Sequence, residues 1–394
     1  MAAGALLVFM ASFGQTYFIS VFAGEIRQEF NLSHGEWGGI YTLGTAAAAI
    51  AMIWAGGLAD RLHVRVLGSV TLGCLALSCL LMAVAPVAWM LPLVIFALRL
   101  TGQGMTMQIA VVAMGRWFNA SRGKAISVAN LGGNVGEAFL PLIFAALLLN
   151  YEWRLLWGVA ALFVTLSVPV LLGLLVREQS VQESATPYEA IGMEDRHWTR
   201  NQAVGHWLFW FMVPALLGPA AVNTAFFFHQ VHFASIKGWQ HVNLVSLFPA
   251  YVGVTVASMV LSGWLLDRVG TARLIPWTQL PLVLCFTLFA QGETLWAAFV
   301  GLFLLALTTG ANAVIPAAFW AEFYGTRHLG AIKATALAVM VFGTALGPGL
   351  SGLLLDVGLG LETQFQVAAL YFIVTTVLMK IGVTRAKGLR EAGI

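Results

Sequence analysis

Charged residues are scarce in this sequence: Asp, Glu, Lys and Arg together make up 9% of 394 residues, against roughly 25% in soluble domains. Apolar residues make up 60%, which at about 20 residues per crossing is enough for about twelve membrane crossings. The composition therefore excludes a soluble fold and leaves little chain for a domain outside the membrane. The net charge of only +3, carried in short basic clusters, also argues against a nucleic-acid-binding protein.

Cysteines and enzyme motifs are equally sparse. Cys74, Cys79 and Cys285 all lie in apolar runs, so we expect neither a disulfide nor a metal site. The sequence contains no Gly-x-x-x-x-Gly-Lys-Ser/Thr, His-Glu-x-x-His or Gly-x-Ser-x-Gly motif, which carry phosphate binding, metalloprotease and hydrolase chemistry. We therefore expect no enzymatic activity, no cofactor and no ATP-driven transport by this chain alone. The first apolar run has no basic leading region, so we expect no cleaved signal peptide.

Long apolar runs, bounded by charged residues, Gly or Pro, make up most of the sequence. Each run is about twice as long as a barrel strand, and a spanning segment must satisfy its own backbone hydrogen bonds, so the runs predict helices. We expect twelve, at 2–23, 37–58, 66–87, 89–114, 124–149, 155–176, 204–228, 242–265, 274–291, 294–318, 331–354 and 363–383. The predicted fold class is an all-α polytopic membrane protein.

The basic residues predict an orientation. Of the 20 Lys and Arg residues, 16 fall on one side of the predicted membrane, and only Arg27, Arg154 and Lys237 fall on the other, with Arg99 inside a helix. By the positive-inside rule, both termini and the loop after every even-numbered helix lie in the cytoplasm. We expect an integral protein of a bacterial inner membrane.

A duplication divides the sequence into halves. Gly-Gly-Leu-Ala-Asp-Arg at 56–61 recurs as Gly-Trp-Leu-Leu-Asp-Arg at 263–268, and the same offset brings Gly136 onto Gly343. The longest polar segment separates six predicted helices from six. We therefore expect an N-terminal bundle at 1–176, a cytoplasmic linker at 177–203 and a C-terminal bundle at 204–394, a known transporter plan.

The repeated loop resembles the signature loop of the major facilitator superfamily, through Gly56, Leu58, Asp60, Arg61 and Arg65. Its echo runs from Gly263 to Arg273. Three further features resemble the oxalate/formate antiporter and monocarboxylate transporter branch: Tyr17, Trp117-Phe118 with Arg122-Gly123, and Gly343-x-x-x-Gly347-Pro348. The resemblance implies two pseudo-symmetric six-helix bundles and secondary transport by alternating access.

The gating candidates follow from this resemblance and from helix packing. The resemblance implies that Asp60 and Arg61 latch the cytoplasmic side, with Asp267 and Arg268 at the equivalent position; charges that only set topology are the alternative. The glycines around Pro348, Gly347 among them, favour close helix packing and a kink or hinge. We expect them to act in gating and not to contact substrate.

Arg99 is the most informative single residue. It lies about ten residues into its predicted helix, about 15 Å from the outer end and so near the bilayer midplane. A charge at that depth costs at least about 2.5–3.5 kcal/mol and marks a functional site by default, although a structural ion pair is the alternative. The guanidinium fork fits a carboxylate, and Gln103 at i+4 shares its face in an α-helix. We predict that both bind substrate.

Glu137 is the only carboxylate placed deep inside a predicted helix, at nearly the depth of Arg99. It is a candidate for proton coupling, since a buried carboxyl can take up a proton during transport. The alternative is that Glu137 only neutralises Arg99 in a structural pair.

Weaker polar and aromatic signals mark further pocket walls, since the resemblance implies that helices 1, 4, 7 and 10 line a central cavity. The candidates are Gln15, Tyr17, Asn223, Phe227, Thr308 and Asn312. Core packing is an equal alternative for each. Gln15 and Tyr17 are separated by roughly 200° on a regular helix, so we expect only one to face the cavity.

The favoured hypothesis is a secondary transporter for a small organic anion, coupled to protons and acting as a monomer in the lipid bilayer. An exporter of amphipathic drugs or metabolites and a transporter-like receptor without flux are the alternatives. His229, His232 and His241 cluster near one helix end. Metal binding or pH sensing there competes with an ordinary interfacial position.

Overall fold

The computed structural model describes residues 1–118, 122–175 and 192–391, and these residues form helices with no β-strand among them. Eleven helices are long and apolar enough to span a membrane. A twelfth span is the pair Ala2–Gly14 and Thr16–Phe30, which is bent by 48° at a break. The all-α polytopic class and the count of twelve are therefore confirmed.

The described residues form two compact units. Unit 1 comprises Met1–Ala185, Phe226–Phe248 and Pro348–Val357, and unit 2 comprises Thr186–Ala225, Pro249–Gly347 and Gly358–Ile394. Two short segments from the second half of the sequence thus pack with the first half. The sequence-based division into 1–176, 177–203 and 204–394 stays a prediction, and residues 177–191 of the expected linker lie outside the described residues.

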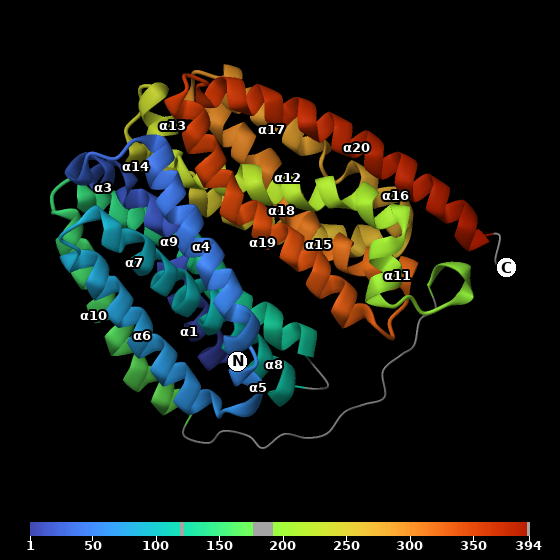
Figure 1. Cartoon of the computed structure of the whole chain (residues 1–394), viewed down its shortest axis with the longest axis horizontal. Helices are drawn as coiled ribbons and strands as arrows, with labels where there is room; N and C mark the ends of the chain where they lie inside the picture. Colours follow the sequence, from blue (N-terminus) through green and yellow to red (C-terminus); the bar gives the residue numbers. More distant parts are fainter. Residues whose placement is uncertain (119–121, 176–191, 392–394) are drawn as a thin grey trace. The chain divides into compact units, whose positions relative to one another are not determined.

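Unit 1 is built mainly from the first half of the chain (Figure 1). Its helices are α1 (Ala2–Ala11), α2 (Thr16–Ile19), α3 (Ala23–Phe30), α4 (His34–Ala55), α5 (Leu58–Arg61), α6 (Val64–Val84), α7 (Leu91–Leu98), α8 (Met107–Trp117), α9 (Arg122–Leu148), α10 (Trp153–Leu174), α13 (Gln230–Ile236) and α14 (His241–Val245). Helix α6 packs along α10, and α1 packs along α9.

Unit 2 carries most of the second half. Its helices are α11 (Arg200–Gly205), α12 (Trp207–Phe228), α15 (Phe248–Val269), α16 (Thr271–Leu274), α17 (Leu280–Gln291), α18 (Leu295–Tyr324), α19 (Leu329–Asp356) and α20 (Leu361–Glu391), of which α12, α15 and α19 extend into unit 1 at one end. Helix α17 packs against both α18 and α20. Trp198, Trp320 and Tyr324 lie at the centre of an aromatic core in this unit.

The first span of unit 1 is interrupted without a proline. After α1, the chain forms a 3₁₀ turn at Ser12–Gly14, and Gln15 adopts an extended backbone with φ −87° and ψ 154° before α2 begins. The fourth span is also irregular, because Arg99–Thr106 forms a π-helix between α7 and α8. Single π turns inside α-helices are frequent at functional sites. Both irregular segments lie where the candidate site is built.

An aromatic cluster buries the second half of the broken span. Phe18 lies edge-on to Phe13, Phe22, Phe144 and Trp157, with ring centroids 4.9 to 5.5 Å apart. Such pairs contribute about 0.5–1.5 kcal/mol each beyond their buried area. The cluster therefore fixes α2 against α9 and α10 even though the helix is interrupted.

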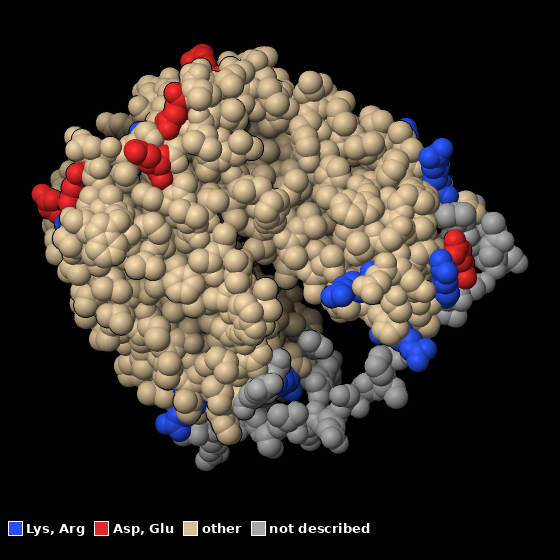
Figure 2. Space-filling model, viewed as in Figure 1, with Lys and Arg blue, Asp and Glu red and all other residues tan. Residues whose placement is uncertain are grey.

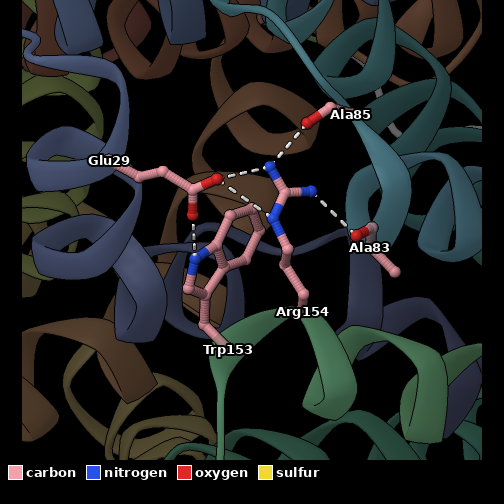
Figure 3. Close-up of polar contacts among 5 residues, drawn as sticks. All are labelled: Glu29, Ala83, Ala85, Trp153 and Arg154. Atoms are coloured by element: carbon pink, nitrogen blue, oxygen red, sulfur yellow. Dashed lines mark hydrogen bonds and ion pairs between the residues drawn. The ribbon is translucent and has the colours of Figure 1, made fainter.

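Arg154 ties three helix ends of unit 1 together (Figure 3). Its guanidinium pairs with Glu29 of α3 at 2.6 Å and donates to the carbonyls of Ala83, in the last turn of α6, and of Ala85, just after it, at 2.9 and 2.7 Å. The Trp153 indole donates to the second Glu29 oxygen at 2.7 Å. One side chain thus satisfies both a carboxylate and the free carbonyls of a helix C-terminus.

The charges of unit 1 are separated along its helices. Acidic side chains gather over the end that carries α3 and α13, whereas basic side chains lie at the end that carries α5 (Figure 2). In unit 2, basic side chains gather around α11 and the C-terminal part of α20. We refer below to the first of these regions, formed by α3, α13 and the start of α4, as the α3–α13 end.

Candidate functional site

The break in the first span is held by close backbone contacts with two other spans. A Cβ on Gly14 would lie only 2.8 Å from the Gly102 Cα of the π-helix, so neither position has room for a side chain. On the α9 side, a Cβ on Gly136 would lie 2.8 Å from the Ser12 Cβ. Glycine is therefore needed where the interrupted backbone meets the fourth and fifth spans.

Arg99 reaches into this break from the π-helix. Its side chain is 3% exposed, and Nη1 donates to the Gly14 carbonyl at 3.1 Å and approaches the Thr16 hydroxyl at 3.5 Å. Thr16 is hydrogen-bonded to the Tyr41 hydroxyl at 2.5 Å, and the Arg99 Cζ lies 5.4 Å from the Tyr41 ring centroid. Arg99 is thus held by one carbonyl, one hydroxyl and one aromatic ring.

No carboxylate compensates this charge within the described part of the chain. No Asp or Glu oxygen there lies within 4.0 Å of the guanidinium, and Nε has no hydrogen-bond partner. The alternative of a structural ion pair with Glu137 therefore finds no support in the geometry. A buried cation without a counter-charge is costly, and the arrangement is suited to an anionic ligand that supplies the missing acceptors.

Glu137 and Arg99 meet electrostatically at Tyr17. The Tyr17 hydroxyl donates to Ser12 Oγ at 2.9 Å, and both charged groups interact with this hydroxyl across the break. Glu137 lies on α9, one residue after Gly136, and is partly exposed. The predicted carboxylate and the predicted cation therefore share a neighbour although they form no direct pair.

The break at Gln15 affects the expectation that Gln15 and Tyr17 point to different sides of a helix. Gln15 and Tyr17 are both partly exposed while Thr16 between them is buried, and Gln15 Nε2 contacts Met107 Sδ at 3.4 Å. The expectation that the two must point apart assumed a continuous helix, which is absent here. Gln103 is partly exposed and shares the π-helix with Arg99, where a spacing of four residues still keeps the two side chains on nearly the same face.

The other candidate wall residues lie in different surroundings. Asn223 is partly exposed, and its buried Oδ1 has no hydrogen-bond partner. Phe227 is packed between Phe226 and Phe248, with ring centroids 5.3 and 5.5 Å away. Thr308 is 1% exposed and donates to the Thr278 carbonyl at 3.0 Å, so its hydroxyl is used inside unit 2. Asn312 is partly exposed.

The gating candidates are only partly described. The side chains of Asp60 and Arg61 lie outside the described residues. In unit 2, Asp267 is exposed and the Arg268 Cζ lies 4.1 Å from the Trp264 ring centroid.

Gly347 and Pro348 lie within α19, which continues through both. A Cβ on Gly347 would come within 2.8 Å of the Ala221 carbonyl carbon of α12. The predicted tight helix packing at this glycine is therefore present.

Asp356 was not selected by the sequence, yet it caps the start of α4. Its carboxylate accepts hydrogen bonds from Ser33 Oγ at 2.6 Å, from the His34 N–H at 3.1 Å and from the Gly35 N–H at 2.9 Å. Ser33 also forms a capping box with Glu36. The Ser-x-x-Glu spacing is a sequence signal for the start of a helix. The sequence carries no signal for a capping partner more than 300 residues away.

We expect Asp356→Ala to loosen the first turn of α4, because three hydrogen bonds to a helix N-terminus are lost. Loss of a cap costs about 0.5–2 kcal/mol, which corresponds to roughly 2- to 30-fold faster local opening. Hydrogen–deuterium exchange of the peptide covering 33–37 measures it. Glu152→Ala is the control, since Glu152 precedes α10 without a side-chain cap. Unchanged exchange in Asp356→Ala would show that the cap contributes nothing.

Of the predicted histidine cluster, the structure brings His229 and His232 together with His34, and His241 does not line their pocket. No group of three His, Cys, Asp or Glu in the described residues could hold a metal ion. The geometry therefore gives no support to metal binding there.

Comparisons with known proteins agree with the fold. The family model described as the Major Facilitator Superfamily matches residues 4–292 and 247–393. Monocarboxylate transporter 13 of Rattus norvegicus is 30% identical over 285 residues, covering 69% of this chain and 62% of that protein, and the Bos taurus protein is 30% identical over 286 residues, covering 69% and 63%. The chain thus spans under two thirds of the length of these relatives.

Two solved structures resemble the whole chain at low sequence identity. A bacterial homologue of the human lysosomal transporter Spinster, in an inward-facing and unoccupied conformation, has a TM-score of 0.74 at 15% identity, with 98% of this chain and 97% of that chain covered. The nucleoside transporter NupG has a TM-score of 0.69 at 15% identity, with 98% of each chain covered. These likenesses concern the fold alone.

Proposed function

The chain belongs to the Major Facilitator Superfamily, and from this premise we propose that it is a secondary active transporter that moves a small organic anion, of the monocarboxylate kind, by alternating access together with a proton. The observation that carries the proposal is Arg99, a buried cation with no carboxylate partner among the described residues. Its planar fork suits a carboxylate. The 30% identity to monocarboxylate transporters supports the same substrate class.

The proposed ligand contacts extend from Arg99 along the break. An anion that accepts from the guanidinium would lie beside Gln15 and Tyr17, with Gln103 on the adjoining π-helix. Asn223, Phe227, Thr308 and Asn312 remain proposed substrate-binding residues, and Asp60, Arg61, Asp267, Arg268, Gly347 and Pro348 remain proposed gating positions. Glu137, through its shared neighbour Tyr17, is the proposed proton-binding group.

We also propose that the α3–α13 end faces the outside of a bacterial inner membrane and that both termini are cytoplasmic. The basic side chains at the α5 end of unit 1 and around α11 and α20 of unit 2 support this orientation, because positively charged residues are retained in the cytoplasm.

Uptake by proteoliposomes tests the proposal. Purified protein should accumulate radiolabelled lactate when the external pH is lower than the internal pH, and unlabelled lactate inside should drive counterflow without a gradient. Tetraphenylphosphonium, a lipophilic cation that crosses bilayers unaided, should enter proteoliposomes no faster than protein-free liposomes. Transport of tetraphenylphosphonium without transport of lactate, pyruvate, acetate, formate or oxalate would overturn the anion assignment. Absence of any flux would overturn the transporter assignment.

A further inference from the structure

A second electropositive site lies at the α3–α13 end of unit 1, in a pocket of about 200 Å³. Its basic lining comes from Arg27 of α3, His34 of α4, and His229 and His232 around the start of α13, and Ser235 adds a hydroxyl. No Asp or Glu occurs among the lining residues that the structure describes. One permanent cation and three groups that can become cations therefore face a space whose lining holds no acid.

The imidazole rings are close to one another. The ring centroids of His34 and His232 are 4.2 Å apart, and those of His34 and His229 are 5.9 Å apart. His229 Nε2 lies 3.4 Å from the Pro348 carbonyl oxygen, and Arg27 Nε donates to the Leu32 carbonyl at 3.3 Å. Protonation of neighbouring rings at these distances is opposed by repulsion between like charges.

The acids nearest to the pocket are already engaged or face elsewhere. The Asp356 carboxylate accepts the three bonds that cap α4 and attracts Arg27 only from a distance, and Glu36 accepts from the Ser33 N–H at 2.8 Å. Glu25 of α3 does not line the pocket. No acid within the described ranges forms an ion pair with Arg27. The protein therefore offsets the positive charge of the pocket only in part.

Protonation of the histidines is coupled to this environment. Burial and the neighbouring His34 lower the pKa of His229 to about 3, and burial and Arg27 lower the pKa of His232. A histidine whose pKa is lowered on folding binds fewer protons than in the unfolded chain, so the packed arrangement loses stability as the pH falls below about 6.5. A bound anion would offset that loss.

The apolar lining narrows the class of anion. Trp37, Phe228 and Val231 share the pocket with the four basic groups, and the Trp37 and Phe228 rings stack with centroids 5.7 Å apart. This mixture suits an anion with a hydrocarbon part better than a fully hydrated inorganic anion. At about 30 Å³ per water-sized group, the pocket has room for an organic anion of about six non-hydrogen atoms.

We propose that this pocket binds a small organic carboxylate at a site separate from Arg99, and that binding tightens as the pH falls because the carboxylate stabilises a protonated histidine. Arg27 supplies the fixed charge, and His34 and His232 supply the groups that titrate. The proposal stands on the pocket's own charges and goes beyond the transport site at Arg99.

Equilibrium binding of radiolabelled lactate to the full chain in detergent, at pH 5.5 and 7.5, tests this. In an Arg99→Met protein one lactate should still bind, with a Kd at least about tenfold lower at pH 5.5, since coupling to one proton gives up to about tenfold per pH unit. Adding Arg27→Gln and His232→Asn should abolish this binding. His328→Asn, at an exposed histidine outside the pocket, should leave it unchanged.

Three outcomes would overturn the proposal: no lactate binding in Arg99→Met, binding that survives Arg27→Gln with His232→Asn, or equal binding of inorganic phosphate. Failure of the transport proposal has a different signature, because Arg99→Met would then retain wild-type lactate uptake. If the combined variant does not fold, His232→Asn alone should weaken binding and reduce its pH dependence, with His34 as the remaining titrating group. In the wild type, lactate should restore the melting temperature lost at pH 5.5, and sodium chloride at the same ionic strength should not.

Discussion

Replacing Arg99 with Met should reduce lactate uptake by proteoliposomes to the level of protein-free liposomes while leaving the protein folded. The guanidinium is the proposed anchor for the substrate carboxylate, and loss of one partner of a buried charge pair costs about 2–5 kcal/mol or more. Arg99→Lys should also fail, by at least about 30-fold in uptake rate, because an ammonium keeps the charge but lacks the planar fork.

Stability measurements separate this role from a structural one. Arg99 has one carbonyl, one distant hydroxyl and no carboxylate as described partners, so an apolar side chain of similar length should preserve or raise the melting temperature. Arg154→Met is the matched control, since it breaks bonds to Glu29, Ala83 and Ala85 and should lower the melting temperature without affecting uptake by the folded fraction. If Arg99→Met is destabilised as Arg154→Met is, and still transports lactate, Arg99 is structural.

The number of spans could be predicted because it depends on quantities that a single sequence carries. Apolar run length placed most ends of the spans to within a few residues, and the place of Arg99 in the middle of its span followed by counting along that run. Predicting these features requires no information on which helices are in contact, because each helix satisfies its own backbone hydrogen bonds.

The break at Gln15 and the π-helix at Arg99 could not be predicted by the same argument. The first span contains no proline, and a local pattern gives no other reason for it to open. Its interruption coincides with the contact between Gly14 and Gly102, which are distant in sequence. The Gly14 carbonyl that holds Arg99 exists as a free acceptor only because the helix is interrupted there.

Long-range partners were missed for a related reason. Asp356 ends an apolar helix, and the sequence alone offers several uses for a carboxylate in that position. Likewise, His34 was not grouped with His229 and His232, because it begins a different helix. The sequence indicates that Asp356 and the histidines need polar neighbours, and the structure shows which neighbours they have at the α3–α13 end.

Arg99 and the α3–α13 pocket lie at different points of the same unit. Under the two proposals, anion binding at each point favours proton uptake, at histidines in the pocket and at Glu137 of α9 beside the break. Under the proposed orientation, low external pH would load the pocket before the anion reaches Arg99.

Glu137→Gln should abolish pH-driven accumulation of lactate while exchange of lactate across the membrane continues. Glu137 forms no ion pair with Arg99 among the described residues, and the charges of both act on the Tyr17 hydroxyl. An anion arriving at Arg99 brings negative charge towards the Glu137 carboxylate, which favours proton uptake there. By linkage, a bound proton then favours the anion by the same factor.

The neutral amide introduced by Glu137→Gln cannot take up that proton, so anion binding would no longer depend on protonation at this position. An imposed pH gradient would then not drive lactate accumulation. The measurements are lactate counterflow at equal pH, which should survive, and lactate accumulation at an external pH two units below the internal pH, which should be lost. Glu152→Gln, at an exposed carboxylate before α10, should retain both activities. Undiminished accumulation in Glu137→Gln would remove Glu137 from proton coupling and leave it as a polar neighbour of Tyr17.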